Sequence, residues 1–390
     1  MIDITGASAL YLSSFPKANT RYFYSHGRLE ILGNHTDHNH GLCLVSGVDL
    51  GITACVAPRD DGIVSIISQG YRPFFFPISD LSPSPRDRSS TRGLTRGVLA
   101  GMKKLGFKIG GFSAALVSDI PAGSGVSSSA CYESLIAHIV DVLYNGKILS
   151  PLAMAKIGQF AENEYFGKPC GLLDQIGTSF GGMCYLDFGG LDGVHVEQVP
   201  FSLPLDITLV NTPSSHAGLN DLYASIPADM KAVARNVFGK ETLREVKKED
   251  FARGICQPSV GVSERAKLRA QHFFDENERV KDAFASLRSG NVVSFLEDVR
   301  RSEASSEALL ANTMVPGRYE NSPQEAVDRA NKILKNGACR IMGGGFAGSI
   351  LAFTPHDETE SFRAAMAAYY GKENVYPAAI FEGGPIVIGA

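Results

Sequence analysis

Residues 120–130 have the sequence Ile-Pro-Ala-Gly-Ser-Gly-Val-Ser-Ser-Ser-Ala, a stretch rich in glycine and serine between two apolar segments. The residues just before them, 111–117, are short and apolar and predict a strand. Residues 131–144 carry apolar side chains at helical spacing, and Asn145-Gly146 is typical of a helix end. The sequence therefore predicts a strand, a glycine–serine loop and a helix in succession.

This loop has the features of a binding site for a polyanion. Gly123 and Gly125 let the backbone approach a ligand, and the first free amides of the following helix point into the loop. The helix dipole favours negative charge there, and the hydroxyls of residues 127–129 can bond phosphate or ligate magnesium. An ordinary capped helix after a tight turn is the alternative. The loop lacks the lysine and spacing of a Walker A motif, which argues against a P-loop NTPase.

Composition narrows the class of protein. The 390 residues are 44% hydrophobic and 20% charged, which is typical of a globular protein with two or three domains. The formal net charge of -4 favours neither nucleic acid nor an anionic membrane as partner. No apolar run approaches a membrane span, no signal peptide is indicated, and seven cysteines lack a C-x-x-C pair. We expect a cytoplasmic protein with free thiols, and nothing here indicates an oligomeric state.

A segment at residues 23–41 is rich in Gly, Asn, His and Asp and precedes two apolar, strand-like runs, so it predicts a binding loop. Four of its side chains are metal ligands by type: His35, Asp37, His38 and His40. Their spacing fits no common zinc motif, and a solvated turn is the simpler explanation. Arg28 and Asp37 are equally suited to clamp a polyol or a phosphate.

Two carboxylates downstream are candidates for chemistry. Residues 151–166 predict a helix that Ser150 caps, and Glu162 lies near its end, where it opposes the helix dipole and needs a cation or arginine partner. An exposed surface acid is the alternative. Asp174 lies among apolar residues, so its carboxylate must be paired, ligated or shifted in pKa, unless it simply caps a helix.

A third glycine-rich stretch lies at residues 338–353. Its Gly343-x-Gly345-x-x-Gly348 formally matches a dinucleotide-binding fingerprint. That fingerprint must open a helix, whereas residues 349–353 continue as a strand. The stretch therefore predicts a hairpin and argues against a dinucleotide-dependent oxidoreductase. Such a hairpin beside an active site would bring backbone close to a substrate phosphate, and a plain turn is the alternative.

Together these stretches resemble the galactokinase branch of the GHMP small-molecule kinases. Four segments carry the resemblance in order: the sugar signature at 27–39, the phosphate loop at 121–130, the catalytic-aspartate segment at 170–175 and the third motif at 342–348. Residues 210–216, Tyr223 and residues 239–246 are similar to the galactokinase second domain. The resemblance runs over most of the chain, and the ordered set is far more specific than any single motif.

The resemblance implies an α+β, two-domain GHMP kinase fold with the active site between the domains. We expect an N-terminal domain at residues 1–200 and a C-terminal domain at residues 201–390. The implied reaction is transfer of phosphate from ATP to the anomeric hydroxyl of a free sugar, with galactose as the expected substrate and Mg²⁺ as cofactor.

The resemblance also assigns roles to residues. Asp174 is the expected catalytic carboxylate, and Arg28 is expected to stabilise the transferring phosphoryl group and to steady Asp174. The expected nucleotide-binding residues are Gly123, Ser124, Gly125, Val126, Ser127, Ser128 and Ser129. The expected sugar-binding residues are Asn34, His35, Asp37, Gly171 and Tyr223. The expected magnesium ligands are Ser128 and Glu162.

One residue departs from the family pattern. The usual Gly-Glu-His-Thr-Asp-Tyr is replaced by Gly-Asn-His-Thr-Asp-His at residues 33–38, so the carboxylate expected to contact the sugar's far hydroxyl is the neutral amide of Asn34. Kinases for N-acetylgalactosamine, a pentose or a uronic acid are therefore alternatives, although no cation except histidine lies near Asn34 to suit a uronic acid. A non-catalytic sugar and ATP sensor is a further alternative, which the retained Arg28 and Asp174 disfavour.

Overall fold

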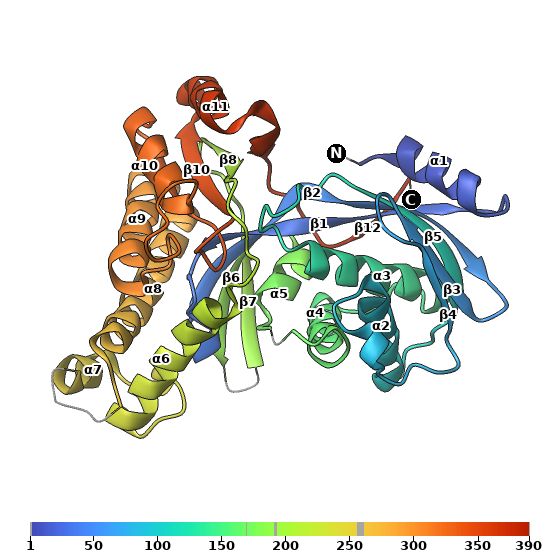
Figure 1. The fold of residues 1–390 in the computed structure, drawn as a ribbon, viewed down its shortest axis with the longest axis horizontal. Coiled ribbons are helices and arrows are strands. Elements are labelled where there is room, and N and C mark those ends of the chain that lie inside the picture. The colour runs from blue at the N-terminus through green and yellow to red at the C-terminus, as the bar shows by residue number, and fades with distance from the viewer. Residues whose placement is uncertain (1, 169, 191–192, 256–260, 390) are drawn as a thin grey trace.

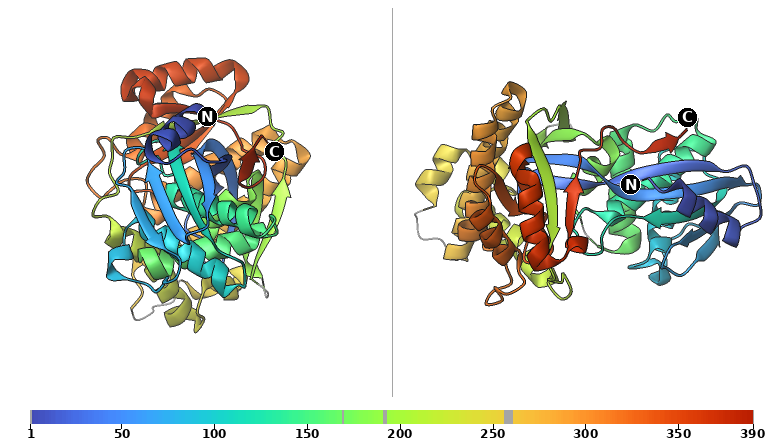
Figure 2. Two further views of the ribbon diagram at one scale, coloured as in Figure 1. Left: turned by 90° about the vertical axis from the view of Figure 1, so that its right-hand side faces the viewer. Right: turned by 90° about the horizontal axis from the view of Figure 1, so that it is seen from above.

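The computed structural model describes residues 2–168, 170–190, 193–255 and 261–389. The chain forms two sheets with their own covering helices, and the two assemblies lie side by side along the long axis of the molecule (Figures 1 and 2). Within the described ranges, no helix is both long enough and apolar enough to cross a membrane.

The first sheet has eight strands in the order β12-β1-β2-β5-β3-β4, with β6 and β7 joined to it through β2. Strand β2 is 18 residues long, so its first part pairs with β6 and its last part pairs with β5. The strands are β1 (Arg21–Leu32), β2 (Leu42–Arg59), β3 (Ile63–Ser68), β4 (Phe74–Pro77), β5 (Gly111–Ser118), β6 (Met183–Gly190), β7 (Gly193–Val199) and β12 (Ile386–Ile388).

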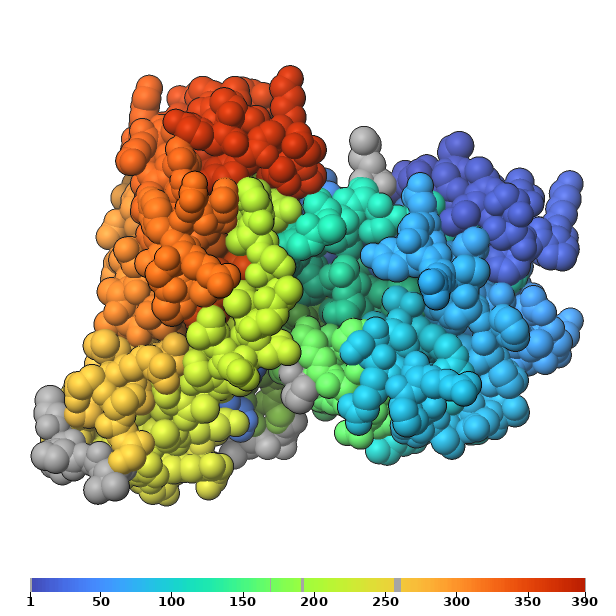
Figure 3. Space-filling model, in the orientation of Figure 1, coloured from blue at the N-terminus to red at the C-terminus, as the bar shows by residue number. Residues whose placement is uncertain are grey.

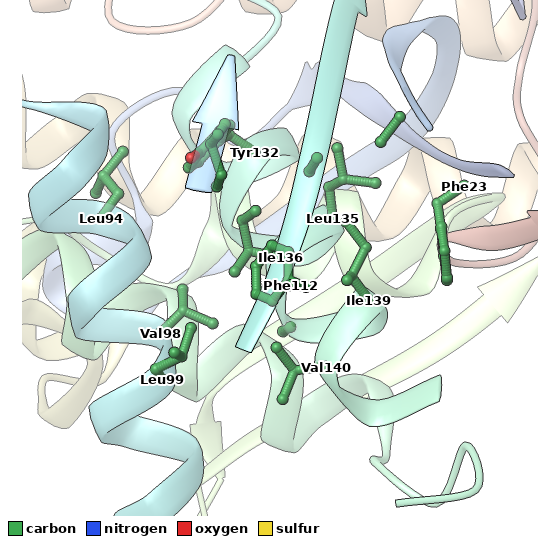
Figure 4. Packing of buried hydrophobic residues seen from close by; sticks show 14 of the residues in the cluster. Phe23, Leu94, Val98, Leu99, Phe112, Tyr132, Leu135, Ile136, Ile139 and Val140 are labelled. Carbon is green, nitrogen blue, oxygen red and sulfur yellow. The ribbon is translucent and has the colours of Figure 1, made fainter. Parts of the chain in front are cut away.

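Side-chain alternation along β5 divides the core between the two faces of this sheet. Ala115 and Val117 face α1 (Ile4–Ser14), whereas Ala114 and Leu116 face the opposite helical layer. That layer contains α2 (Thr91–Lys104), α3 (Ser128–Tyr144), α4 (Pro151–Phe160) and α5 (Leu173–Phe180). Figure 4 shows the apolar stripe of α3, including Leu135, Ile136, Ile139 and Val140, packed between α2 and β5.

The second sheet is antiparallel, with the order β11-β8-β10-β9. Its strands are β8 (Leu205–Asn211), β9 (Ala338–Ile341), β10 (Ser349–Pro355) and β11 (Val375–Ala378). Alternate residues of β10 again face different helices, because Leu351 and Phe353 contact α8 and α9 while Ile350 and Ala352 contact α10 and α11. The helices after residue 200 are α6 (Asn220–Phe238), α7 (Lys248–Gly254), α8 (Glu264–Ser289), α9 (Val292–Ser305), α10 (Pro323–Ile333) and α11 (His356–Tyr370).

The end of the chain returns to the first sheet, where Ile388 of β12 pairs with Tyr22 of β1. A division of the chain near residue 200 therefore leaves one C-terminal strand with the N-terminal sheet. The domain boundary expected near residue 200 therefore stays a prediction.

Most local predictions around the loop at residues 120–130 are confirmed. The strand before it is β5 and the helix after it is α3. The side chain of Ser150 caps α4 by accepting a hydrogen bond from Ala153 N, and β9 and β10 form the predicted hairpin. One helix differs: α4 stops at Phe160 and continues as a π-helix over Ala161–Phe166 before Gly167 ends it.

The packing of α3 predicts the effect of truncating a core side chain. Leu135 is fully buried, so we expect Leu135→Ala to lower the free energy of unfolding by about 2–5 kcal/mol. Leu12→Ala is the matched control, because Leu12 is 60% exposed and its loss should cost less than about 0.5 kcal/mol. Denaturant unfolding followed by circular dichroism measures both, and equal effects would contradict this core assignment.

Candidate active site

The loop between β5 and α3 leaves backbone amides free for a ligand. Gly123 and Gly125 have φ angles of 74° and 73°, a region that favours glycine. Ser127 stands at the N-cap of α3 with φ 58°, and its side chain makes no capping hydrogen bond to the described residues of the helix. The first amides of α3 are therefore not satisfied by a cap, which suits them to bind an anion.

The side chain of Arg28 joins this loop to Asp174. Its Nε and Nη2 donate to Asp174 Oδ1 at 2.9 and 2.8 Å, and its Nη1 donates to the carbonyl of Gly125. Ser127 Oγ donates to the other carboxylate oxygen, Oδ2, at 2.7 Å. The structure thus brings together three residues that the sequence places far apart.

The charge state of Asp174 follows from these contacts. Burial alone raises the pKa of this carboxyl, but Arg28, the Ser127 hydroxyl and Lys168 outweigh burial, and the net pKa lies below its ordinary value. The side chain is 32% exposed, so it is held on one side and open on the other. An ionised, oriented and accessible carboxylate can accept a hydrogen bond or a proton from a substrate hydroxyl.

A second acidic group lies behind the loop. Glu162 is 1% exposed and accepts hydrogen bonds from Ser129 Oγ at 3.2 Å, Lys168 Nζ at 3.3 Å and Gln175 Nε2 at 2.8 Å. Gln175 Nε2 also donates to Glu133 at 3.2 Å, and burial together with the nearby Glu162 raises the pKa of Glu133 well above its ordinary value. Ser129 rather than Ser128 contacts Glu162, because the side chain of Ser128 is exposed at the first turn of α3.

Two expected sugar-site residues, His35 and Tyr223, contact the turn of the hairpin. His35 Nε2 donates to the carbonyl of Gly344 at 3.0 Å, and burial, with His38 nearby, lowers the pKa of His35 to about 3, so its ring is neutral. Tyr223 Oη donates to the carbonyl of Gly345 at 2.8 Å. The ring of Tyr223 also packs against Gly344.

Two further expected sugar-site residues, Asp37 and Gly171, lie close to each other. A Cβ on Gly171 would lie 2.5 Å from Asp37 Oδ2, so a side chain at position 171 would displace the Asp37 carboxylate. Asp37 is mostly buried, with a side-chain exposure of 13%, and its other oxygen lies 3.6 Å from His38 Nε2. Gly171 is three residues before Asp174, the carboxylate that Arg28 holds.

Asn34 is the remaining residue expected to contact the sugar. The residue is fully buried, its Nδ2 donates to Glu30 Oε1 at 2.9 Å and to the Gly343 carbonyl at 2.6 Å, and its Oδ1 accepts from Asn312 Nδ2 at 2.8 Å. Both ends of the amide are thus occupied within the protein. Residue 34 is enclosed by partners 309 and 278 positions away, and its contact with a sugar stays a prediction.

The glycine hairpin completes the site from the second sheet. Ser349 Oγ donates to the carbonyl of Ser124 at 2.9 Å, and Asn211 Nδ2 donates to the carbonyl of Ala122 at 3.3 Å. In the space-filling view, the yellow-green segment after residue 205 lies directly beside the teal surface that follows β5 (Figure 3). The sugar signature, the phosphate loop and the third motif therefore meet in one place.

Sequence reasoning missed three residues of this region. Lys168 is beside Glu162 and acts electrostatically on Asp174, yet nothing but its position just before residues 170–175 distinguishes it from a surface lysine. Asn312 anchors Asn34 and the Gly344 carbonyl, and Glu30 accepts from Asn34. Glu30 could have been predicted to lie near the site, because it is two residues after Arg28 on a strand and such residues share one face.

The alternative of a metal site at His35, Asp37, His38 and His40 gains no support. Among the residues that the structure describes, no group of three or more His, Cys, Asp and Glu side chains is arranged to hold a metal ion. The neutral His35 ring is instead used to bond the Gly344 carbonyl.

Two family models match this chain. Residues 94–182 match the GHMP kinases N terminal domain, and residues 9–58 match the galactokinase galactose-binding signature. The first range contains the phosphate loop and Asp174, and the second contains Arg28 and the sugar signature. Both matched ranges thus cover the residues that the structure brings together.

Similar proteins cover nearly the whole chain. A galactokinase of Lactococcus lactis (strain IL1403) is 28% identical over 366 residues, which are 92% of this chain and 89% of that protein. A galactokinase of Limosilactobacillus reuteri (strain DSM 20016) is 27% identical over 388 residues, 96% of each.

Solved structures similar to this chain also include a galactokinase. The crystal structure of Lactococcus lactis galactokinase complexed with galactose has a TM-score of 0.85 at 26% identity and covers 97% of this chain and 98% of its own. The mevalonate kinase of Methanococcus jannaschii shares the fold alone, with a TM-score of 0.66 at 13% identity over 94% of this chain and 100% of its own. The chain belongs to the galactokinase family of GHMP kinases and is a phosphotransferase of galactokinase type.

Proposed function

We propose that the protein transfers the terminal phosphoryl group of ATP to the anomeric hydroxyl of galactose. The observation that carries the proposal is the Arg28–Asp174–Ser127 arrangement, in which an ionised carboxylate faces outward next to a phosphate-binding loop. The match of residues 9–58 to a galactose-binding signature supports galactose as the sugar. The galactose complex of the Lactococcus lactis relative supports the same choice.

In the proposed reaction, Asp174 orients the anomeric hydroxyl and accepts its proton as the oxygen attacks phosphorus. Arg28 keeps this carboxylate in one orientation through two hydrogen bonds and supplies positive charge beside the transferring group. The loop at residues 123–129 binds the phosphates of ATP through the free amides of α3 and the serine hydroxyls. Asp37, Gly171, His35 and Tyr223 shape the sugar side of the site.

Glu162 and a serine of the loop are suited to Mg²⁺. The donor set is made of hard oxygen atoms, Ser129 Oγ already lies 3.2 Å from Glu162, and a buried oxygen of Glu133 has no hydrogen-bond partner among the described residues. We propose Glu162 with Ser129 or Ser128 as the residues that hold the ion. Bound Mg²⁺ would neutralise charge on the nucleotide phosphates.

The proposed substrate is tested by measuring ADP release with free sugars. The panel contains galactose, N-acetylgalactosamine, a pentose and galacturonic acid, each with ATP and Mg²⁺. Galactose is expected to give the highest kcat/KM. A higher value for N-acetylgalactosamine would replace galactose with an amino sugar, and ATP binding without ADP release from any sugar would favour a sensor.

Asp174→Asn should lower turnover by roughly 10²-fold or more, because the amide cannot take the proton. Nucleotide binding should persist, since the amides of the loop are unchanged. Asp61→Asn is the matched control, because Asp61 is a surface residue paired with Arg59. Turnover of Asp174→Asn close to that of the native protein would remove Asp174 from the proposed mechanism.

The lowered pKa of Asp174 sets the acid side of the pH profile. Because the active form is the carboxylate, kcat/KM should fall as the pH drops through this lowered pKa. Ser127→Gly removes the hydroxyl that donates to Oδ2 while glycine suits the positive φ, so the pKa should rise and the acid limb should move to higher pH. An acid limb that stays in place would show that another group sets it.

Glu162→Gln should raise the Mg²⁺ concentration that gives half-maximal turnover, because a neutral amide is a weaker ligand for a hard cation than a carboxylate. Glu164→Gln is the matched control, since Glu164 is exposed two residues away. The measurement is turnover against free Mg²⁺ at fixed ATP. An unchanged magnesium requirement in Glu162→Gln would exclude Glu162 as a ligand.

A further inference from the structure

Glu30 lies on the same side of strand β1 as Arg28, because residues two apart on a strand point to one face. Two residues along a strand span roughly 6–7 Å. That distance is close to the long dimension of a hexose. A sugar whose anomeric hydroxyl meets Asp174, held by Arg28, therefore extends toward Glu30 if it lies along β1.

Glu30 has one oxygen engaged and one oxygen available. Its Oε1 accepts a hydrogen bond from Asn34 Nδ2 at 2.9 Å. Its Oε2 accepts none from the described residues, and this atom is not among the polar atoms that are sealed from solvent without a partner. The residue as a whole is 7% exposed, so this oxygen keeps only a small contact with solvent.

The surroundings of Glu30 belong to the proposed site. The pKa of Glu30 lies above its ordinary value, because burial and Asp37 raise it more than Arg340 and Arg28 lower it, so all three charged groups act on this carboxyl. Arg28 and Asp37 are the residues assigned to catalysis and to the sugar. Arg340 is fully buried and donates from Nη1 to the backbone carbonyls of Glu30 and Ile31, which fixes this part of β1.

Asn34 is built to orient Glu30. Its Nδ2 also donates to the Gly343 carbonyl and its Oδ1 accepts from Asn312, so the amide cannot turn without breaking a buried hydrogen bond. The neutral residue at position 34 and the carboxyl at position 30 form one hydrogen-bonded pair. The carboxyl group that is missing from position 34 is thus present at position 30.

We propose that Glu30, oriented by Asn34, accepts a hydrogen bond from the hydroxyl of the sugar farthest from the anomeric carbon and so determines specificity there. This inference rests on the proposed galactokinase function. It changes the role of Asn34 from substrate contact to positioning residue, and it explains how a chain with an amide at position 34 keeps a carboxyl for the sugar.

The test compares kcat/KM for galactose and for 6-deoxygalactose in the native protein and in Glu30→Gln. The native protein is expected to prefer galactose, and Glu30→Gln is expected to lower the galactose to 6-deoxygalactose ratio by about tenfold, because a bond to a charged acceptor is about twice as strong as a neutral one. A merely structural role of Glu30 would lower both values equally and leave the ratio unchanged.

A second variant separates position from charge. The double substitution Glu30→Gln with Asn34→Glu keeps one carboxyl and one amide in the pair but exchanges their places. We expect it to recover a galactose to 6-deoxygalactose ratio above that of Glu30→Gln alone. Recovery of the ratio shows that residues 30 and 34 act together as a hydrogen-bonded pair. A ratio no higher than that of Glu30→Gln shows that the carboxyl must be at position 30.

Several results would overturn the inference. The ratio in Glu30→Gln could equal the native ratio, which excludes Glu30 as the acceptor while galactose remains the substrate. If Glu30→Gln does not fold, the inference is tested on the native protein alone. Equal kcat/KM values for galactose and 6-deoxygalactose would show that the native protein makes no specific contact with that hydroxyl. If the native protein does not phosphorylate galactose at all, the proposed function fails and the inference fails with it.

Discussion

The Arg28 guanidinium is the contact on which the site depends. It joins β1 to Asp174 on α5 through two hydrogen bonds and to the loop at residues 120–130 through the Gly125 carbonyl, while Arg28 N donates to the Val126 carbonyl at 3.0 Å. Its side chain is only 6% exposed, so loss of Asp174 would leave a buried guanidinium without its charge partner. Arg28 and Ser127, which donates to the other carboxylate oxygen, therefore fix the distance between the carboxylate and the phosphate loop.

A second set of bonds closes the site from the other sheet. The turn between β9 and β10 presents carbonyls that no strand partner uses, and Asn34, His35 and Tyr223 each donate to one of them. These donors come from the loop after β1 and from α6. Both sheets contribute residues to the same small region. The sugar side and the phosphate side of the site are therefore fixed relative to each other.

Local features of the sequence predicted the elements but not their contacts. Helical spacing and Asn145-Gly146 located α3, and Ser150 located the start of α4, since these signals act within a few residues. The enclosure of Asn34 could not be predicted, because its partner Asn312 is 278 positions away and carries no signal of its own. The π-helix at Ala161–Phe166 was missed for a similar reason, since its sequence continues the helical pattern of α4 without a break.

Ser127 shows how a local rule is broken at the site. A serine at an N-cap normally bonds the helix, worth about 1 kcal/mol, and the left-handed conformation costs a side-chain residue about 1–2 kcal/mol. Ser127 gives up the cap and adopts that conformation, and its hydroxyl bonds the ionised Asp174 instead, a contact worth about 1.5–3 kcal/mol. The opposing terms are similar in size, so stability does not explain the choice. The functional consequence explains the conformation of Ser127. The amides of α3 stay free for phosphate, and the Asp174 carboxylate gains a second hydrogen-bond donor.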